Sequence, residues 1–425
     1  MKLTPISLLL LAATLISSDL AFAASKFAIP ATDEGLPGEG PIRRYGWFQN
    51  LWERKRSDWA KKVEQDQGAL VFLGDSITQG WGDNMGNSFP GVKVANRGIS
   101  GDTTRGVLIR MKGDVLDLNP KGVVILIGTN DLEEKASPEV IAGNLKLIIA
   151  KLKKHNSKMP IILCHTFPSS ASKRRPADQI KKINQLYFAA VKGDPQVTVL
   201  DTWLLFADAK GDAKKLEFPD LLHPNKLGYA KWAAALRPLL ATNGFIETKP
   251  EDFAMEPGFV SLFNGKDLSG WGFRAKKTFK QTAGFDGKKA SDDSRYKAIN
   301  GRLVVTTPPE GRRVQQLWTT KEFPKDFTLK LEFRATPNAD SGVFIRKPQL
   351  QCRDYILAGP WKDLKNYKPQ EWNEIVAVVK GGVAHCTCNG EVLNAEFKVP
   401  ATGPIGLEGD RGQMEYRRIR LKMSK

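Results

Sequence analysis

Short apolar runs alternate with helix-like patterns over residues 45–245, and this alternation predicts a parallel sheet with helices on both faces. The runs are rich in Val, Ile and Leu, as strands buried on both faces require, and they occupy residues 69–73, 92–95, 122–127, 160–164 and 197–200. Between them apolar residues recur every three or four positions, for example at Val107, Met111, Val115 and Leu118. The pattern therefore predicts an α/β domain over residues 65–247, with any site at the carboxyl ends of its strands.

The pattern changes after residue 247, and the change predicts a second domain. Residues 248–256 are polar and Pro-containing, which is typical of a linker. In residues 257–425 apolar and polar positions alternate, most clearly in FTLKLEFR from Phe327, as in half-buried strands. Asn-Gly pairs at 300–301 and 389–390 are typical hairpin turns, so an all-β antiparallel sandwich is expected here.

The composition fits two globular domains and narrows the range of partners. The chain has 425 residues, of which 41% are hydrophobic and 26% charged, which excludes disordered and collagen-like classes. Its net charge is +18, but no run of five Lys or Arg occurs, so a nucleic-acid partner is not expected. The positive charge is suited to anionic polymers, although it also fits a solubilising surface.

The first 23 residues predict export. A basic residue, Lys2, precedes an apolar stretch of signal-peptide length at residues 6–16, and a small-x-small cleavage site follows at residues 21–23. The stretch is too short to span a bilayer, so no stable membrane insertion is expected. We expect a signal peptide at 1–23, an N-terminal extension at 24–64 and a mature protein in the periplasm or outside the cell.

Four cysteines indicate structural roles. Cys164 lies in an apolar stretch and is expected to be a buried thiol. Cys352 could form a disulfide with Cys386 or with Cys388, which lie on one face of the same expected strand. Because the chain has only four His and no ligand pair of the CxxC or HExxH type, no metal or other cofactor is expected.

Four short motifs in the first domain combine into a candidate hydrolytic site. Ser76 follows the first expected strand, Gly101 follows the second, and Asn130 follows the third. Asp220 and His223 stand three residues apart before the last helix, a spacing that lets the carboxylate orient the imidazole. Each motif alone fits an ordinary turn or cap. Together they supply a nucleophile, oxyanion donors, a base and its partner at one edge of the sheet.

Three further residues lie near the expected site and have weaker arguments. Trp81 and Asp83 follow the Ser76 loop and could line the pocket, although loop packing explains them as well. His165 ends the fourth strand at the same edge, but the Asp220–His223 pair is the better candidate for the base.

The motifs GDSIT, GISGDTT, GTND and DLLHPN resemble those of GDSL-type, or SGNH, hydrolases over about residues 65–242, closest to platelet-activating-factor acetylhydrolase catalytic subunits. The resemblance implies a flavodoxin-like three-layer sandwich. It implies that Ser76 is the nucleophile, His223 the general base and Asp220 its partner. It also implies an oxyanion hole of the Ser76 and Gly101 N–H groups and the Asn130 amide.

Residues 257–425 resemble the domain named for 3-keto-disaccharide hydrolase, on the motifs FNGKDLSGW, SGVFIR and GPIGL. That resemblance implies a jelly-roll sandwich of concanavalin or laminin-G type that faces carbohydrate, either as a binding module or as a second glycoside-acting site. Candidate surface residues are Trp271, Arg346, Asp354 and Trp372, although core packing for the two Trp and a solvated surface for the two charged residues explain them more simply.

The combination favours an exported serine esterase that removes O-acyl groups, acetyl above all, from carbohydrate. This expectation rests on the association of the two domains and not on any single residue. The expected partners are an acylated polysaccharide or a small acyl ester, and the oligomeric state stays open. Alternatives are a lipid or thioester hydrolase, a glycan-binding protein, or an enzyme whose main activity lies in the second domain.

Overall fold

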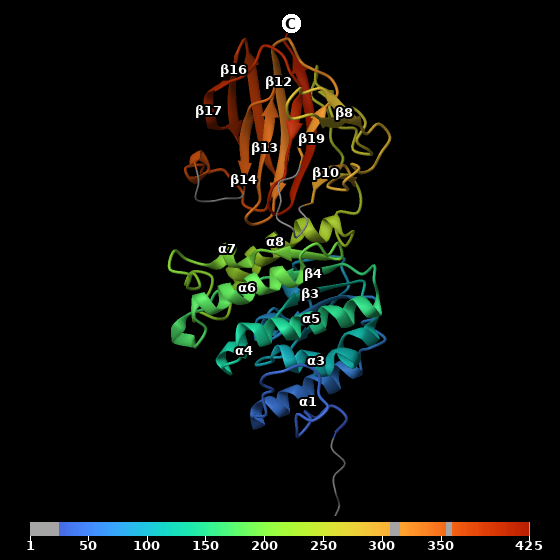
Figure 1. The fold of residues 1–425 in the computed structure, drawn as a ribbon, viewed down its shortest axis with the longest axis vertical. Helices are drawn as coiled ribbons and strands as arrows, with labels where there is room; N and C mark the ends of the chain where they lie inside the picture. Colours follow the sequence, from blue (N-terminus) through green and yellow to red (C-terminus); the bar gives the residue numbers. More distant parts are fainter. Residues whose placement is uncertain (1–24, 307–314, 354–358, 425) are drawn as a thin grey trace, which may run out of the picture.

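The computed structural model describes residues 25–306, 315–353 and 359–424, and it separates the chain into two domains stacked along the long axis (Figure 1). The α/β domain carries α1 (Gly46–Ala60) at the end away from the sandwich, and α8 (Lys226–Thr242) lies at the junction. The expected signal peptide, residues 1–23, lies outside the described residues. The two fold classes expected from the hydrophobic pattern are confirmed.

The first domain is built on a parallel sheet of five strands in the order β2-β1-β3-β4-β5. The strands are β1 (Leu70–Gly74), β2 (Val94–Gly98), β3 (Gly122–Leu126), β4 (Ile161–Cys164) and β5 (Val197–Leu200). All five overlap the apolar runs of the sequence, although β2 shares only residues 94 and 95 with the expected run 92–95 and ends three residues later. Strand order reverses beside β1, so the carboxyl ends of β1, β2 and β3 meet at one edge, where α/β sheets hold their sites.

Helices cover both faces of the sheet and make the three layers. The helices between α1 and α8 are α2 (Ser76–Gly80), α3 (Thr104–Asp114), α4 (Thr129–Glu133), α5 (Pro138–His155), α6 (Ala177–Val191) and α7 (Thr202–Phe206). Alternate strand residues point to opposite faces. Val71 and Leu73 pack with α3, α5 and α6, whereas Leu70 and Phe72 pack with α2, α7 and α8.

The N-terminal extension is a packed part of the first domain. Buried Phe48, Trp52 and Trp59 of α1 form an apolar cluster with Ile99, which follows β2. The Arg110 guanidinium of α3 lies 6.0 Å from the Trp52 ring centroid and 5.6 Å from that of Trp59. These contacts hold the extension against the strand ends that carry the site motifs.

Residues after 257 form two facing antiparallel sheets. One has the order β17-β16-β15-β12-β19-β10-β9, with β6 paired to β19, and the other has the order β14-β13-β18-β11-β7-β8. The strands of the first are β6 (Val260–Ser261), β9 (Tyr296–Ile299), β10 (Arg302–Val305), β12 (Phe327–Ala335), β15 (Asn373–Lys380), β16 (Val383–Cys388), β17 (Glu391–Lys398) and β19 (Met414–Met423). Those of the second are β7 (Trp271–Arg274), β8 (Gln281–Gly284), β11 (Leu317–Thr319), β13 (Asp340–Ile345), β14 (Gln349–Arg353) and β18 (Ile405–Leu407).

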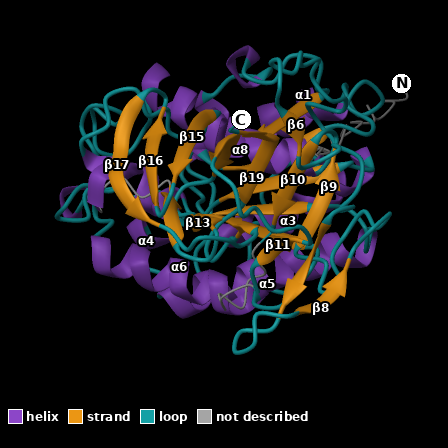
Figure 2. Ribbon diagram, turned by 90° about the horizontal axis from the view of Figure 1, so that it is seen from above, coloured by secondary structure: helices purple, strands orange, loops and turns teal. Residues whose placement is uncertain are grey.

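One apolar core fills the space between the two sheets of the sandwich. On β12 the buried residues alternate with half-buried polar ones, as the sequence pattern predicted. Seen down the long axis, the first sheet curves from β17 and β16 through β15 and β19 to β10 and β9 (Figure 2). Cys352, Cys386 and Cys388 are buried in this core as free thiols, so the structure does not contain the disulfide left open above.

The domain junction is a buried polar network. Glu415 of β19 is fully buried and accepts hydrogen bonds from Arg302 (3.1 Å) and Arg334 (2.5 Å). The same two arginines pair with Glu247, at the end of the first domain, at 3.0 and 2.8 Å. Gln413 donates to the Pro238 carbonyl of α8 at 3.0 Å. These bonds fix the two domains to each other.

The polar segment after residue 247 is docked on the sandwich. Glu251 pairs with Arg417 at 2.7 Å, and Glu256 pairs with Arg420 at 2.6 Å. The Arg420 guanidinium holds the pKa of Glu256 down at about 2. The segment is therefore tied to β19 along its length.

No helix in the described part of the chain combines the length and hydropathy needed to cross a bilayer.

Candidate active site

A chain of hydrogen bonds joins Ser76, His223 and Asp220 at the carboxyl edge of the sheet. The Ser76 Oγ lies 3.0 Å from His223 Nε2, and His223 Nδ1 lies 2.8 Å from Asp220 Oδ2. The carboxylate fixes the proton on Nδ1 and leaves Nε2 free to accept the serine proton. The three residues expected to act together are thus brought within hydrogen-bond reach, although 147 positions separate Ser76 from His223.

Ser76 is held at the tip of a tight strand-to-helix turn. It is the first residue of α2, directly after β1, and the Asp75 side chain caps the helix by accepting from the Ile77 N–H at 2.9 Å. Full burial of Asp75 raises the pKa of its carboxyl to about 6. The backbone of α2 packs against the end of β2 with no room for a side chain. A Cβ added to Gly98 would lie only 2.4 Å from the Gln79 nitrogen. Only glycine permits that approach.

The loop that carries His223 is held by hydrogen bonds within and beyond it. Asp220 Oδ1 accepts from the His223 N–H at 2.7 Å and from the Leu222 N–H at 3.0 Å. Leu221 adopts a left-handed φ of 64°, and its carbonyl accepts from Ser169 Oγ at 2.8 Å. Burial opposes ionisation of Asp220, but its bonds to His223 outweigh it and lower the pKa of the carboxyl. Asp220 therefore remains a carboxylate.

Gly101 lines the same pocket as Ser76. Its φ is +88°, which disfavours other residues, and a Cβ there would lie 2.7 Å from Trp47 Cη2. Among the described residues, the N–H groups of Gly101 and Ser76 have no hydrogen-bond partner. Two backbone donors of the pocket wall are thus available to an oxyanion.

The Asn130 side chain is oriented by its neighbours. Its Nδ2 donates to the Asp102 carbonyl at 3.0 Å, and its Oδ1 accepts from Arg175 Nη2 at 3.0 Å. Arg175 is itself buried and donates to the Thr129 carbonyl at 3.1 Å and to Glu133 at 2.8 Å. Since a guanidinium only donates, it must face the amide oxygen, and the NH₂ group is turned toward Asp102 and the pocket.

Two buried carboxylates support the loops that carry Gly101 and Asn130. Asp102 pairs with Arg110 at 2.7 Å, and Arg110 also donates to the Gly74 carbonyl at 3.1 Å. Asp131 accepts from the Thr104 hydroxyl at 2.5 Å and from the Thr104 N–H at 3.0 Å. Burial raises the pKa of Asp102 to about 6 and that of Asp131 to about 7. Through Arg110, Asp102 connects the segment after β2 to the end of β1, and Asp131 connects the segment after β3 to the segment after β2.

The candidate residues open into a pocket of about 480 Å³. Its wall contains Ser76, Gly101, Asn130 and His223, and all of its lining residues belong to the first domain. Of its lining side chains, only those of Trp47 and Leu222 are apolar. The arrangement can transfer an acyl group to a serine and can stabilise the charge that develops on the carbonyl oxygen.

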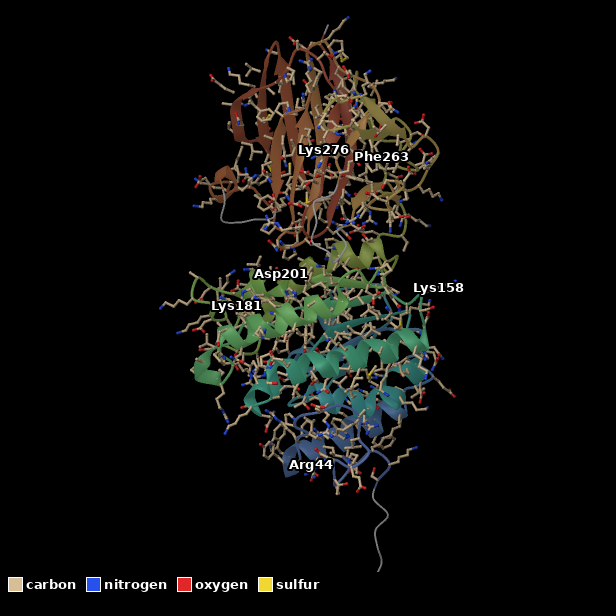
Figure 3. The ribbon with its side chains drawn as sticks, in the orientation of Figure 1. Arg44, Lys158, Lys181, Asp201, Phe263 and Lys276 are labelled. Atoms are coloured by element: carbon tan, nitrogen blue, oxygen red, sulfur yellow. The ribbon has the colours of Figure 1, made fainter. Side chains whose placement is uncertain are left out.

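The three weaker candidates of the first domain lie outside this pocket. Trp81 is buried and stacks on Trp232, with ring centroids 4.5 Å apart, so loop packing explains it. Asp83 is exposed and lies 3.9 Å from Lys62. His165 follows β4, and its Nδ1 lies 3.4 Å from Asp201. Figure 3 shows Asp201 facing the sandwich, whereas Arg44 lies at the other end of the domain.

Two of the four surface candidates of the second domain, Trp271 and Arg346, are buried and serve the packing of the sandwich. Trp271 is fully buried and donates to the Leu262 carbonyl at 2.7 Å. Arg346 is also buried and donates to backbone carbonyls, among them that of Phe323 at 2.7 Å. Trp372 is half-buried, and the guanidinium groups of Arg334 and Arg417 lie 4.6 and 4.0 Å from its ring centroid. Asp354 lies outside the described residues.

Sequence reasoning missed the residues of the pocket that lie outside the motifs. Arg43 and Trp47 come from the N-terminal extension, and Glu133 and Arg175 come from α4 and from the loop before α6. Arg175 has no local signal for this role, because Thr129, Asn130 and Glu133, to which it donates at the site, are 42 to 46 positions away. Within the described residues no group of three His, Cys, Asp or Glu gathers as metal ligands.

Comparison with known families divides the chain in the same way as the fold. Residues 72–231 match the GDSL-like Lipase/Acylhydrolase family, and residues 258–422 match the 3-keto-alpha-glucoside-1,2-lyase-like domain. Human platelet-activating factor acetylhydrolase IB subunit alpha2 is 27% identical over 228 residues, 53% of this chain and 93% of that protein. The mouse alpha1 subunit is 29% identical over 211 residues, 48% of this chain and 90% of that protein.

A solved GDSL-like lipase from Bacteroides thetaiotaomicron is 23% identical to the matched part of this chain, with a TM-score of 0.39. The match covers 44% of this chain and 98% of the lipase.

Proposed function

We propose that this protein, a serine ester hydrolase with a GDSL-like lipase/acylhydrolase domain and a 3-keto-alpha-glucoside-1,2-lyase-like domain, removes acetyl groups from carbohydrate outside the cytoplasm. The observation that carries the proposal is the pocket. Each buried CH₂ of an acyl chain gains about 0.8 kcal/mol from apolar surface. Only two of the pocket's lining side chains are apolar, so the pocket offers a long acyl chain little apolar surface. It therefore favours a short acyl group on a polar alcohol.

In the proposed mechanism His223 Nε2 accepts the proton of Ser76 as its Oγ attacks the ester carbonyl, starting from the 3.0 Å contact. The Ser76 and Gly101 N–H groups and the Asn130 amide stabilise the oxyanion, at about 3 kcal/mol for each donor. The imidazolium then protonates the departing alcohol. Water attacks the acyl-enzyme with His223 as base, which releases the acid and restores Ser76.

The test is acetate release from O-acetylated polysaccharides, together with aryl esters from acetyl to octanoyl. We expect acetate from the polymers and a kcat/KM that falls steadily as the acyl chain lengthens. The Ser76→Ala variant, measured in parallel, gives the background. A preference for octanoyl esters, with no acetate from any polymer, would favour the lipid hydrolase alternative.

Export is the second part of the proposal, and it rests on the N-terminal pattern of residues 1–23. The mature chain is expected to begin at Ala24. Intact mass of the protein recovered from the periplasm or medium tests this, and recovery of the full-length chain from the cytoplasm contradicts it.

The second domain supports one further candidate activity, because its family model is that of a 3-keto-glucoside-acting domain. Incubation of Ser76→Ala with 3-keto-disaccharides separates the two activities. Release of free sugar by this esterase-deficient variant would assign glycoside cleavage to the sandwich, and no release would leave it a binding module.

A further inference from the structure

The mouth of the pocket carries an excess of positive charge. Four of its lining side chains are cationic and one, Glu133, is anionic; the cations are Arg43, Lys173, Arg174 and Arg175. Arg175 is buried and bonded to Asn130 and Glu133, whereas the Arg174 side chain is 70% exposed and lies 3.3 Å from Glu133. Charge of one sign in a concave wall concentrates ligands of the opposite sign.

Arg43 is buried yet keeps one nitrogen unbonded at the pocket wall. Its side chain is only 6% exposed, and it is held by Glu134, 2.7 Å from Nε, and by Glu133, which contacts Nη2. Within the described chain Nη1 has no hydrogen-bond partner. This nitrogen faces Gly101, where an added Cβ would lie 3.0 Å from it. A guanidinium fixed at two nitrogens thus presents the third to the pocket.

Trp47 adds an exposed aromatic ring at the same wall. Its side chain is 54% exposed although it lines the pocket, and its ring stacks with that of Tyr45, with centroids 6.4 Å apart. Tyr45 is the N-cap residue of α1, and Trp47 lies in its first turn. An indole left open to water beside a reactive serine is suited to pack against the apolar face of a sugar ring.

We propose that Trp47 and Arg43 form a subsite for an acylated sugar that carries an anionic group, such as a uronic acid. The inference rests on the proposed esterase function and specifies its substrate class. The sugar ring stacks on Trp47, Nη1 of Arg43 donates to the anionic oxygen, and Lys173 and Arg174 attract the charge from the rim. Arg43 and Trp47 precede residue 72, where the acylhydrolase match begins.

A charge-assisted bond of this kind is strong in a partly buried site, because the arginine is already desolvated and held in place. Both glutamates that hold Arg43 are shared with other groups: Glu133 also pairs with Arg175 at 2.8 Å, and Glu134 contacts the Tyr45 hydroxyl at 3.1 Å. The subsite and the Asn130 side chain are thus parts of one hydrogen-bonded network.

The experiment compares acetylated polygalacturonate, an acidic polymer, with acetylated glucomannan, a neutral one, using the full-length protein. We expect kcat/KM to be at least tenfold higher on the acidic polymer at low salt, with the preference shrinking as salt screens the charges. Arg43→Lys keeps a cation beside Glu133 and Glu134 but removes Nη1. It should raise KM for the acidic polymer about tenfold and change its kcat far less.

The exposed rim is tested separately by Lys173→Gln combined with Arg174→Gln, which should flatten the salt dependence on the acidic polymer. Lys112→Gln is the matched control: it removes a cation that is 84% exposed on α3, away from the pocket, and should leave the acidic-to-neutral ratio unchanged. Thermal unfolding of each variant monitors folding.

Three results overturn the inference. Equal kcat/KM of the wild type on the two polymers would leave the esterase but remove its anionic specificity. A kcat that falls equally on every ester in Arg43→Lys would place Nη1 at the oxyanion instead. No acetate from either polymer, with aryl acetate still cleaved, would overturn the proposed function together with the inference.

Discussion

The orientation of one amide decides whether the third oxyanion donor exists. Asn130 could present either its oxygen or its NH₂ to the pocket, and the bond from Arg175 to its Oδ1 selects the NH₂. Arg175 is therefore a positioning residue. It acts through Asn130, and its partners Thr129 and Glu133 hold it in place.

Arg175→Ala should lower kcat for an aryl acetate by about 10²-fold with a smaller change in KM, because the lost interaction belongs to the transition state. Asn130→Ala should lower kcat by about 10²–10³-fold for the same reason. The kcat of the double variant should be close to that of Asn130→Ala alone, because the two changes remove the same oxyanion donor. Fully additive losses would show that Arg175 acts independently of Asn130.

Ser76→Ala should abolish ester hydrolysis and leave the fold intact, because it removes one oxygen from a half-buried position. Aryl acetate turnover measures the loss, and thermal unfolding measures the fold. Turnover within tenfold of the wild type would contradict the nucleophile assignment.

At the scale of elements, the carboxyl ends of the first three strands are joined by buried carboxylates. Burial raises the pKa of Asp131, after β3, to about 7, whereas an unfolded Asp titrates near pH 4. Between these values the folded protein binds more protons than the unfolded chain, so this group makes the free energy of unfolding fall as pH rises. Asp75 and Asp102 act in the same direction up to about pH 6.

Asp131→Asn removes that titration while keeping an acceptor for Thr104. The difference in unfolding free energy between variant and wild type, measured by urea denaturation at pH 4, 5.5 and 7, should shift in favour of the variant by a few kcal/mol, at about 1.4 kcal/mol for each pKa unit. A difference that is constant with pH would mean that Asp131 titrates alike in both states.

At the scale of the whole molecule, the candidate pocket and the domain junction are separate. The pocket is lined by the first domain alone, whereas the junction depends on Glu415 and its arginines. The carboxyl of Glu415 is fully desolvated, which raises its pKa, although Arg334 and Arg302 oppose the shift.

Glu415→Gln should destabilise the protein by about 3–5 kcal/mol, because it leaves two buried guanidinium groups with one partner fewer. Its kcat on an aryl acetate should stay within about twofold of the wild type. Glu251→Gln is the matched control: its carboxylate is 58% exposed, so loss of its pairs with Arg417 and Arg418 should cost less than about 1 kcal/mol. Equal destabilisation by the two changes would contradict the buried network.

The sequence alone predicted the two fold classes, the five parallel strands and the proximity of Ser76, Asp220 and His223. Strand runs such as 122–127 are local patterns of apolar residues, and a parallel sheet collects their carboxyl ends at one edge. The positions of the motifs along the chain therefore suffice to predict that Ser76 and His223 meet, because each motif follows a strand or precedes a helix at that edge.

The packing of the elements, and not the sequence pattern, decides which side chains surround Ser76, Asp220 and His223. Arg43 and Trp47 enter the pocket because α1 packs through Trp52 and Phe48 onto the strand end near Ile99. Arg175 reaches Asn130 across 45 positions. Such contacts join residues with no common period or motif, and they form only when separate elements pack together. A polar side chain then acquires its role from the partners that packing leaves to it.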